Sequence, residues 1–274
     1  MKKIRDFSKH SPIWFSVAFT LLVILVNETF ANIFHLFPAS LIKDYVHELL
    51  FIAWPVAMVM LFGFGFIFRQ KGFRETRAVA RPMILLYFIT MLGQIANMVL
   101  NPDTQWKSSL EIVLGVIMLL GVGFREEILF RGVIANAIGR KYANSTKGIW
   151  ITVISSGVIF GALHMANMFH GVSFQSALIQ SIDAIGGGMY CCAVYLRGGS
   201  IWVVALMHTL LDAAGGVTFL FANAGNLIDA INGTSMDVLY LLPLDLLLTA
   251  FLLRKSKRQR IMDRMQQLSQ EHAV

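Results

Sequence analysis

The chain has 274 residues, of which 56% are hydrophobic and only 14% are charged. A soluble domain carries roughly 25% charged residues, so the composition excludes an ordinary water-soluble protein. The net charge of +7 could suggest nucleic-acid binding, but the basic residues alternate with long apolar stretches, as in membrane proteins. No nucleic-acid partner is expected.

Eight apolar stretches follow one another along the chain, and each is close to the roughly 20 residues that cross a bilayer as a helix. Backbone polar groups in lipid must be paired within their own segment, which favours helices. The predicted fold is therefore all-α: a polytopic membrane protein with about eight transmembrane helices around a polar cavity. The predicted spans are residues 13–36, 46–68, 83–100, 109–138, 148–169, 174–196, 200–221 and 235–253.

The basic residues predict how these spans are oriented. Under the eight-span arrangement, 19 of the 23 Lys and Arg residues fall on one side of the membrane. The positive-inside rule then places both termini in the cytoplasm of a multi-pass cell-membrane protein, and the short basic loops are typical of a bacterial chain. The basic run from Arg254 to Arg264 is either a segment attracted to anionic membrane lipid or a simple stop-transfer signal.

The spans differ in their polar content. Spans one to three look like scaffold, and isolated polar residues in them, such as Glu28 and Gln94, are typical of interhelical hydrogen bonds. Cys191 and Cys192 are adjacent in span six and are expected to pack as small apolar residues. We divide the chain into an N-terminal scaffold (1–107), a polar core (108–222) and a last span with a basic tail (223–274).

Ionisable residues interrupt spans four, five and seven. Each such group at membrane depth costs at least ~2.5–3.5 kcal/mol on insertion scales, so each is a functional-site hypothesis. Glu127 and Arg131 are spaced i,i+4 and share a helix face, where they can pair. His208 and Asp212 have the same spacing, which lets the carboxylate orient the imidazole or share a water with it. The candidate site residues are Glu126, Glu127, Arg131, His164, His208 and Asp212.

Glu126 points about 100° around the helix from Glu127 and has no i,i+4 partner of its own. A buried carboxylate can act as a general base on water, and two imidazoles can hold that water or stabilise an oxyanion. Glu126, His164 and His208 would equally make a 2-His-1-carboxylate site for a divalent metal such as zinc. The residues also leave open a non-proteolytic membrane regulator or binding protein, and a transporter that relays protons.

Three short motifs, in this order on separate helices, resemble those of the CPBP family. That family comprises the type II CAAX prenyl endopeptidases and the bacterial Abi proteins of bacteriocin processing or self-immunity. Its pattern is EExxxR, then FxxxH, then HxxxN or HxxxD. Here the pattern reads Glu126-Glu127…Arg131, Phe160…His164 and His208…Asp212, within residues 108–222.

The resemblance implies an intramembrane endopeptidase for a peptide or membrane-protein substrate, with a cavity open to the cytoplasm and a role in bacteriocin self-immunity or peptide maturation. Glu126 would activate the water, and His164 would position it. His208 with Asp212 would stabilise the oxyanion, while Glu127 and Arg131 would hold the geometry. No cofactor is expected in this glutamate-dependent version, whereas the metal version would use zinc or a similar ion. Asp212 replaces the more usual Asn and lacks its N–H donor.

Overall fold

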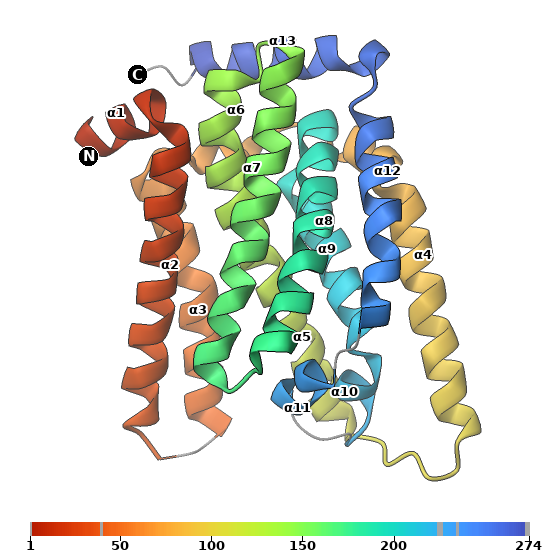
Figure 1. Cartoon of the computed structure of the whole chain (residues 1–274). Coiled ribbons are helices and arrows are strands. Elements are labelled where there is room, and N and C mark those ends of the chain that lie inside the picture. Colours follow the sequence, from red (N-terminus) through yellow and green to blue (C-terminus); the bar gives the residue numbers. More distant parts are fainter. Residues whose placement is uncertain (1, 39–40, 224–226, 234–235, 272–274) are drawn as a thin grey trace.

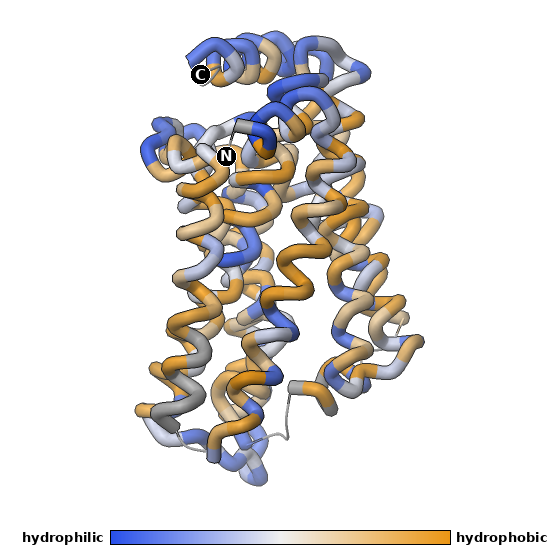
Figure 2. Tube along the Cα trace, turned by 90° about the vertical axis from the view of Figure 1, so that its left-hand side faces the viewer, coloured by the Kyte–Doolittle hydropathy of each residue, from blue (hydrophilic) through white to orange (hydrophobic). Residues whose placement is uncertain are grey.

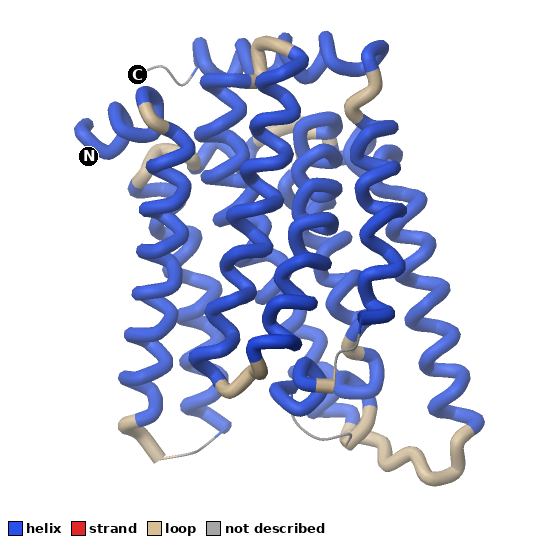
Figure 3. The backbone as a smooth tube through the Cα atoms, viewed as in Figure 1, coloured by secondary structure: helices blue, strands red, loops and turns tan. Residues whose placement is uncertain are grey.

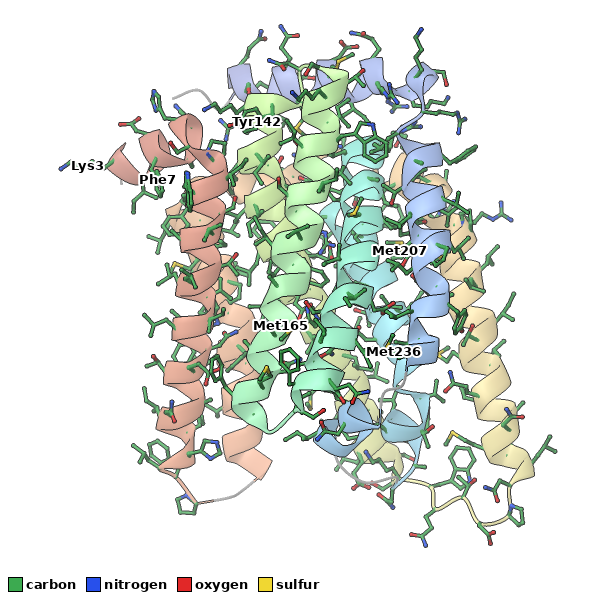
Figure 4. The ribbon with its side chains drawn as sticks, in the orientation of Figure 1. Lys3, Phe7, Tyr142, Met165, Met207 and Met236 are labelled. Atoms are coloured by element: carbon green, nitrogen blue, oxygen red, sulfur yellow. The ribbon has the colours of Figure 1, made fainter. Side chains whose placement is uncertain are left out.

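The computed structural model describes residues 2–38, 41–223, 227–233 and 236–271, and every regular element in those ranges is a helix (Figure 1 and Figure 3). In chain order they are α1 (Lys2–His10), α2 (Pro12–His35), α3 (Leu41–Leu61), η1 (Gly65–Arg69), α4 (Phe73–Leu100), α5 (Ser109–Glu127), η2 (Ile128–Ala135), α6 (Asn136–Tyr142), α7 (Thr146–His164), η3 (Met165–His170), α8 (Phe174–Gly198), α9 (Ile201–Gly215), α10 (Val217–Phe221), α11 (Leu227–Asn232), η4 (Met236–Leu241), α12 (Leu242–Leu252) and α13 (Lys255–Glu271).

The predicted spans fall on these helices, although residue 235 at the start of the last span lies outside the described residues. Four described helical segments are long and apolar enough to cross a membrane: Pro12–His35, Phe73–Leu100, Thr146–His170 and Phe174–Gly198. Shorter apolar helices lie at Leu49–Leu61, Ile201–Gly215 and Val238–Leu252. The all-α membrane class is confirmed, while the count of eight crossings and the three-part division of the chain stay predictions.

The long helices run side by side, and the two termini lie at the same end of the bundle (Figure 1). Hydrophilic residues cover that end of the bundle above the apolar helices, and others lie at the opposite end (Figure 2). Basic side chains of different segments meet at the end with the termini: Arg197 Nη1 donates to Leu252 O at 3.2 Å, and Lys141 Nζ donates to His10 O. We call this the basic end. Basic residues that the positive-inside rule places on one side of the membrane, among them Lys141 and Arg197, therefore lie at the same end of the bundle.

Helix α8 is the most buried of the four long helical segments. In its apolar stretch 61% of the residues are buried, against 17% in α4. Close approach of α7 to α8 depends on glycine. A Cβ added at Gly157 would lie 2.5 Å from Met189 Cγ, and one at Gly161 would lie 2.5 Å from Ser181 O. These distances are shorter than van der Waals contact, so a larger side chain would force the two helices apart.

Polar contacts tie the outer helices α2 and α4 to the rest of the bundle. Gln94 Nε2 on α4 donates to Ala214 O on α9 at 2.6 Å, which is the interhelical bond that the sequence predicted. Glu28 Oε1 on α2 lies 2.9 Å from His170 Nε2 on η3. Cys191 and Cys192 are free and buried in α8, as expected.

The basic C-terminal run forms a helix that lies across the basic end of the bundle (Figure 1). Helix α13 buries Ile261, Met265 and Leu268, which share one face at i, i+4 and i+7. The apolar face of the tail is therefore covered by protein, which neither reading of the basic run anticipated.

Candidate active site

The fourth predicted span is not one uninterrupted α-helix. Helix α5 ends at Glu127, and η2 continues as a π-helix before α6 begins. The side chain of Asn136 explains how the wider turn is tolerated: its Nδ2 donates to the carbonyls of Arg131 and Gly132, both at 2.9 Å. π-helical turns are rare and frequent at functional sites, and this one lies directly beside the Glu126-Glu127 pair.

Glu127 is the anchor of the site. Its Oε1 accepts from Arg131 Nη1 at 2.7 Å and from His208 Nδ1 at 2.8 Å. The i,i+4 pair that the spacing predicted is thus present, and both of its side chains are fully buried. Arg131 Nη2 also donates to Gly188 O on α8 at 2.9 Å, so the guanidinium joins α8 to this part of the chain.

The imidazole of His208 is held by Glu127 and not by Asp212. Because a carboxylate accepts, Nδ1 carries the proton of the 2.8 Å bond. The other nitrogen, Nε2, lies 3.6 Å from Asp212 Oδ1 and 3.7 Å from Glu126 Oε2. Both distances exceed a hydrogen bond. Of the two roles that the i,i+4 spacing allowed for Asp212, a shared water fits and orientation of the ring does not.

Glu126 and Glu127 face the same imidazole from its two nitrogens, although they diverge around the helix. The His208 ring lies across the helix face, and this accounts for the convergence. Glu126 also has a loose cation partner: Arg125 Nη2 lies 3.8 Å from its Oε1. Arg125 therefore places a positive charge near the Glu126 carboxylate, which has no i,i+4 partner. This carboxylate remains the accessible one, with a side chain 15% exposed against 0% for Glu127.

His164 ends α7 and lies at the same cluster. Its Nδ1 is 3.1 Å from Phe160 O, and since a carbonyl can only accept, Nδ1 donates and Nε2 keeps its lone pair. Glu126 and His208 both lie within electrostatic range of this ring. The structure therefore brings all six predicted side chains together, from α5, η2, α7 and α9.

Phe160 and Gly188 also border the site, although neither is among the six candidate residues. The Phe160 ring lies 4.9 Å from the His164 ring and 5.7 Å from the His208 ring, and the Arg131 guanidinium lies 4.6 Å above it. A Cβ at Gly188 would come within 2.9 Å of that ring. The FxxxH motif contained a signal for Phe160, whereas Gly188 was one of three adjacent glycines with nothing to single it out.

A metal site was the alternative that the sequence left open for Glu126, His164 and His208. Across the described ranges, no three His, Cys, Asp or Glu side chains converge closely enough to hold a metal ion. The three side chains as placed do not fit that ligand set, so we derive no step through a metal.

The exposed members of the cluster lie away from the basic end. On α9, Asp212 is 27% exposed and is one turn farther from that end than His208, which is 7% exposed. Arg131, nearer the basic end than Glu126, is fully buried. The exposure of these side chains therefore increases toward the end where α10 and α11 lie (Figure 1).

Residues 108–214 match the family model described as "Type II CAAX prenyl endopeptidase Rce1-like". The matched segment includes all six residues of the cluster. Neither a curated protein nor a solved structure matches the chain. The resemblance seen in the motifs is thus confirmed for residues 108–214, which are similar to the type II CAAX prenyl endopeptidases, a family of proteases.

Proposed function

We propose that the chain is an intramembrane endopeptidase in which Glu126 activates the attacking water. The observation that supports this most is the arrangement around His208. Glu127 holds the imidazole through Nδ1, and Nε2 is left 3.7 Å from Glu126 Oε2. That separation is too long for a hydrogen bond and short enough for one water to contact both groups.

In the proposed reaction, Glu126 accepts a proton from the water while the water oxygen attacks the peptide carbonyl carbon. The proton then passes to the leaving nitrogen as the C–N bond breaks, which restores the carboxylate. His164 presents a lone pair at Nε2 and would accept the second water hydrogen, which fixes the direction of attack. No covalent intermediate with the protein is required.

The developing oxyanion needs a hydrogen-bond donor. Protonated His208 donates from both nitrogens: Nδ1–H is engaged by Glu127, and Nε2–H is directed at the reacting centre. Asp212, at 3.6 Å from Nε2, cannot donate when ionised, so we assign to it the holding of a water or of the substrate N–H. Arg131 neutralises Glu127, which prevents that buried carboxylate from competing as a base.

The proposed substrate is a peptide or a segment of a membrane protein, cleaved in bacteriocin self-immunity or in the maturation of a peptide. Anionic membrane lipid is a second proposed partner. Arg197 and Arg254 lie close enough at the basic end to repel one another, and negative headgroups would relieve that repulsion. Both termini would then lie in the cytoplasm of the cell.

The test measures the new N- and C-termini that proteolytic cleavage produces among the membrane proteins of a cell. It compares cells that express the wild-type chain, Glu126→Gln, Glu111→Gln or no chain. Glu111 is an exposed carboxylate on the same helix, bonded to Ser108 at the start of α5, and so is a matched control. New termini should appear with the wild type and Glu111→Gln, and disappear with Glu126→Gln at equal abundance. Termini unaffected by Glu126→Gln would instead favour the non-proteolytic regulator.

A further inference from the structure

A chain of buried hydrogen bonds leads from the candidate active site to the helix at the basic end. It begins at Asn136, the first residue of α6, whose Nδ2 donates to the carbonyls of the π-helical turn and also to Tyr195 Oη at 2.8 Å. Tyr195 Oη in turn donates to Gln70 Oε1 at 2.8 Å. Asn136 and Tyr195 are both 0% exposed.

Arg264 of α13 completes this chain. Its Nη2 donates to the same Gln70 Oε1 at 2.8 Å, and its Nη1 donates to Tyr195 O at 2.7 Å. The guanidinium also lies 5.1 Å from the Tyr195 ring. Arg264 thereby caps the last carbonyls of α8, where a cation is favoured by the helix dipole.

The direction of each bond is fixed by chemistry. An arginine only donates and a backbone carbonyl only accepts, so Gln70 must present its oxygen and Asn136 its nitrogen. Tyr195 then has a single consistent role, as acceptor from Asn136 and donor to Gln70. The two Nδ2 hydrogens of Asn136 are shared among three acceptors, and hydrogen bonds linked in a buried chain strengthen one another.

The other end of the network reaches the reacting groups. Asn136 holds the carbonyl of Arg131, the Arg131 guanidinium holds Glu127 at 2.7 Å, and Glu127 holds His208 Nδ1 at 2.8 Å. From α13 to the His208 imidazole, each residue of this series is joined to the next by a hydrogen bond shorter than 3 Å. Asn136, Tyr195 and Gln70 have no place in the proposed chemistry, and packing alone would not require hydroxyl and amide groups there.

We propose that Asn136, Tyr195, Gln70 and Arg264 are positioning residues for the active site, and that α13 acts as a clamp that fixes the π-helical turn. The inference rests on the proposed function for its activity readout. A second readout, the His208 imidazole itself, does not depend on proteolysis.

The test uses the full-length purified protein in lipid and the variants Tyr195→Phe and Arg264→Met. Tyr195→Phe removes only a hydroxyl. Loss of one buried hydrogen bond is worth roughly a 3- to 10-fold effect, and we expect kcat to fall by about that factor with KM unchanged. Arg264→Met should act in the same direction, Arg264→Lys should restore part of the loss, and the double variant should lose less than the product of the two single effects.

Arg260→Met is the matched control. Arg260 lies on the same helix, and its contact with Glu75 is an exposed one at 3.9 Å. This variant should keep the wild-type kcat. The cleavage rate is divided by the fraction of folded protein, which thermal unfolding of the same samples measures. A variant that only unfolds therefore does not count as support.

The ¹⁵N signals of the histidine rings, with His208 assigned from a His208→Gln sample, give the independent readout. Tyr195→Phe and Arg264→Met should shift the His208 signals, and Arg260→Met should not. Wild-type kcat together with unchanged His208 signals in folded Tyr195→Phe would overturn the inference. Shifted signals in a chain that cleaves nothing would keep the inference and reject the proposed function.

Discussion

Replacement of Arg131 by Met is the perturbation that tests the core of the site most sharply. It would leave Glu127 fully buried, with the hydrogen bond from His208 Nδ1 still in place but without its cation partner. It would also remove the 2.9 Å bond to Gly188 O and the contact 4.6 Å above the Phe160 ring. Breaking one side of a buried ion pair costs about 3–5 kcal/mol.

This cost should appear in the unfolding temperature of the purified protein in detergent. For chains of roughly this size, 1 kcal/mol corresponds to about 2–4 °C, so Arg131→Met should lower the midpoint by roughly 6–20 °C. Arg125→Met is the control, because Arg125 lies a loose 3.8 Å from Glu126 and 4.9 Å from the Phe51 ring, and loose ion pairs are worth less than about 1 kcal/mol.

The double variant Glu127→Gln with Arg131→Met separates the ion pair from general damage to packing. With the buried charge removed as well, the combined loss should be about 2 kcal/mol smaller than the sum of the two single losses. Single effects that add to within about 0.5 kcal/mol would refute the reasoning, because they would show that the two groups do not interact.

Three further outcomes are expected. Gly188→Ala should lower both stability and activity, because its Cβ would lie 2.9 Å from the Phe160 ring, whereas Gly93→Ala, with nothing within 4 Å, should be neutral in an unfolding assay; equal effects would contradict the packing described. Exhaustive chelation should leave cleavage intact, and a loss that zinc restores would reject the metal-free mechanism. A membrane-impermeant thiol reagent should label Asp212→Cys from the side opposite to Ser256→Cys on α13, while labelling of both from one side would show that the site opens toward the basic end.

The fold was predictable because its signals are local. Apolar stretches of span length marked the helices, and the grouping of basic residues marked the end where they meet. The tail was harder: Ile261, Met265 and Leu268 are three apolar residues in a strongly polar segment, and only the bundle end that they cover gives them a partner. The π-helical turn could not be predicted either, since it depends on Asn136 and on contacts from α8.

The site was predictable where its contacts are local. The Glu127–Arg131 pair lies within one helical turn, so spacing alone predicted it. The bond between Glu127 and His208 joins residues 81 apart, and sequence spacing says nothing about such a contact. For that reason the i,i+4 spacing left two roles open for Asp212, orienting the ring or sharing a water, whereas Glu127 in fact holds the ring.

The central claim is that Glu126 activates the water that cleaves the substrate. The most direct measurement is the single-turnover cleavage rate of purified wild-type protein and Glu126→Gln in lipid, on a substrate found from the cell comparison. General-base catalysis contributes typically 10²–10⁴-fold, and Gln keeps the size of the side chain. The rate should therefore fall by at least about 100-fold with substrate binding preserved. A Glu126→Gln protein that cleaves at the wild-type rate would contradict the account.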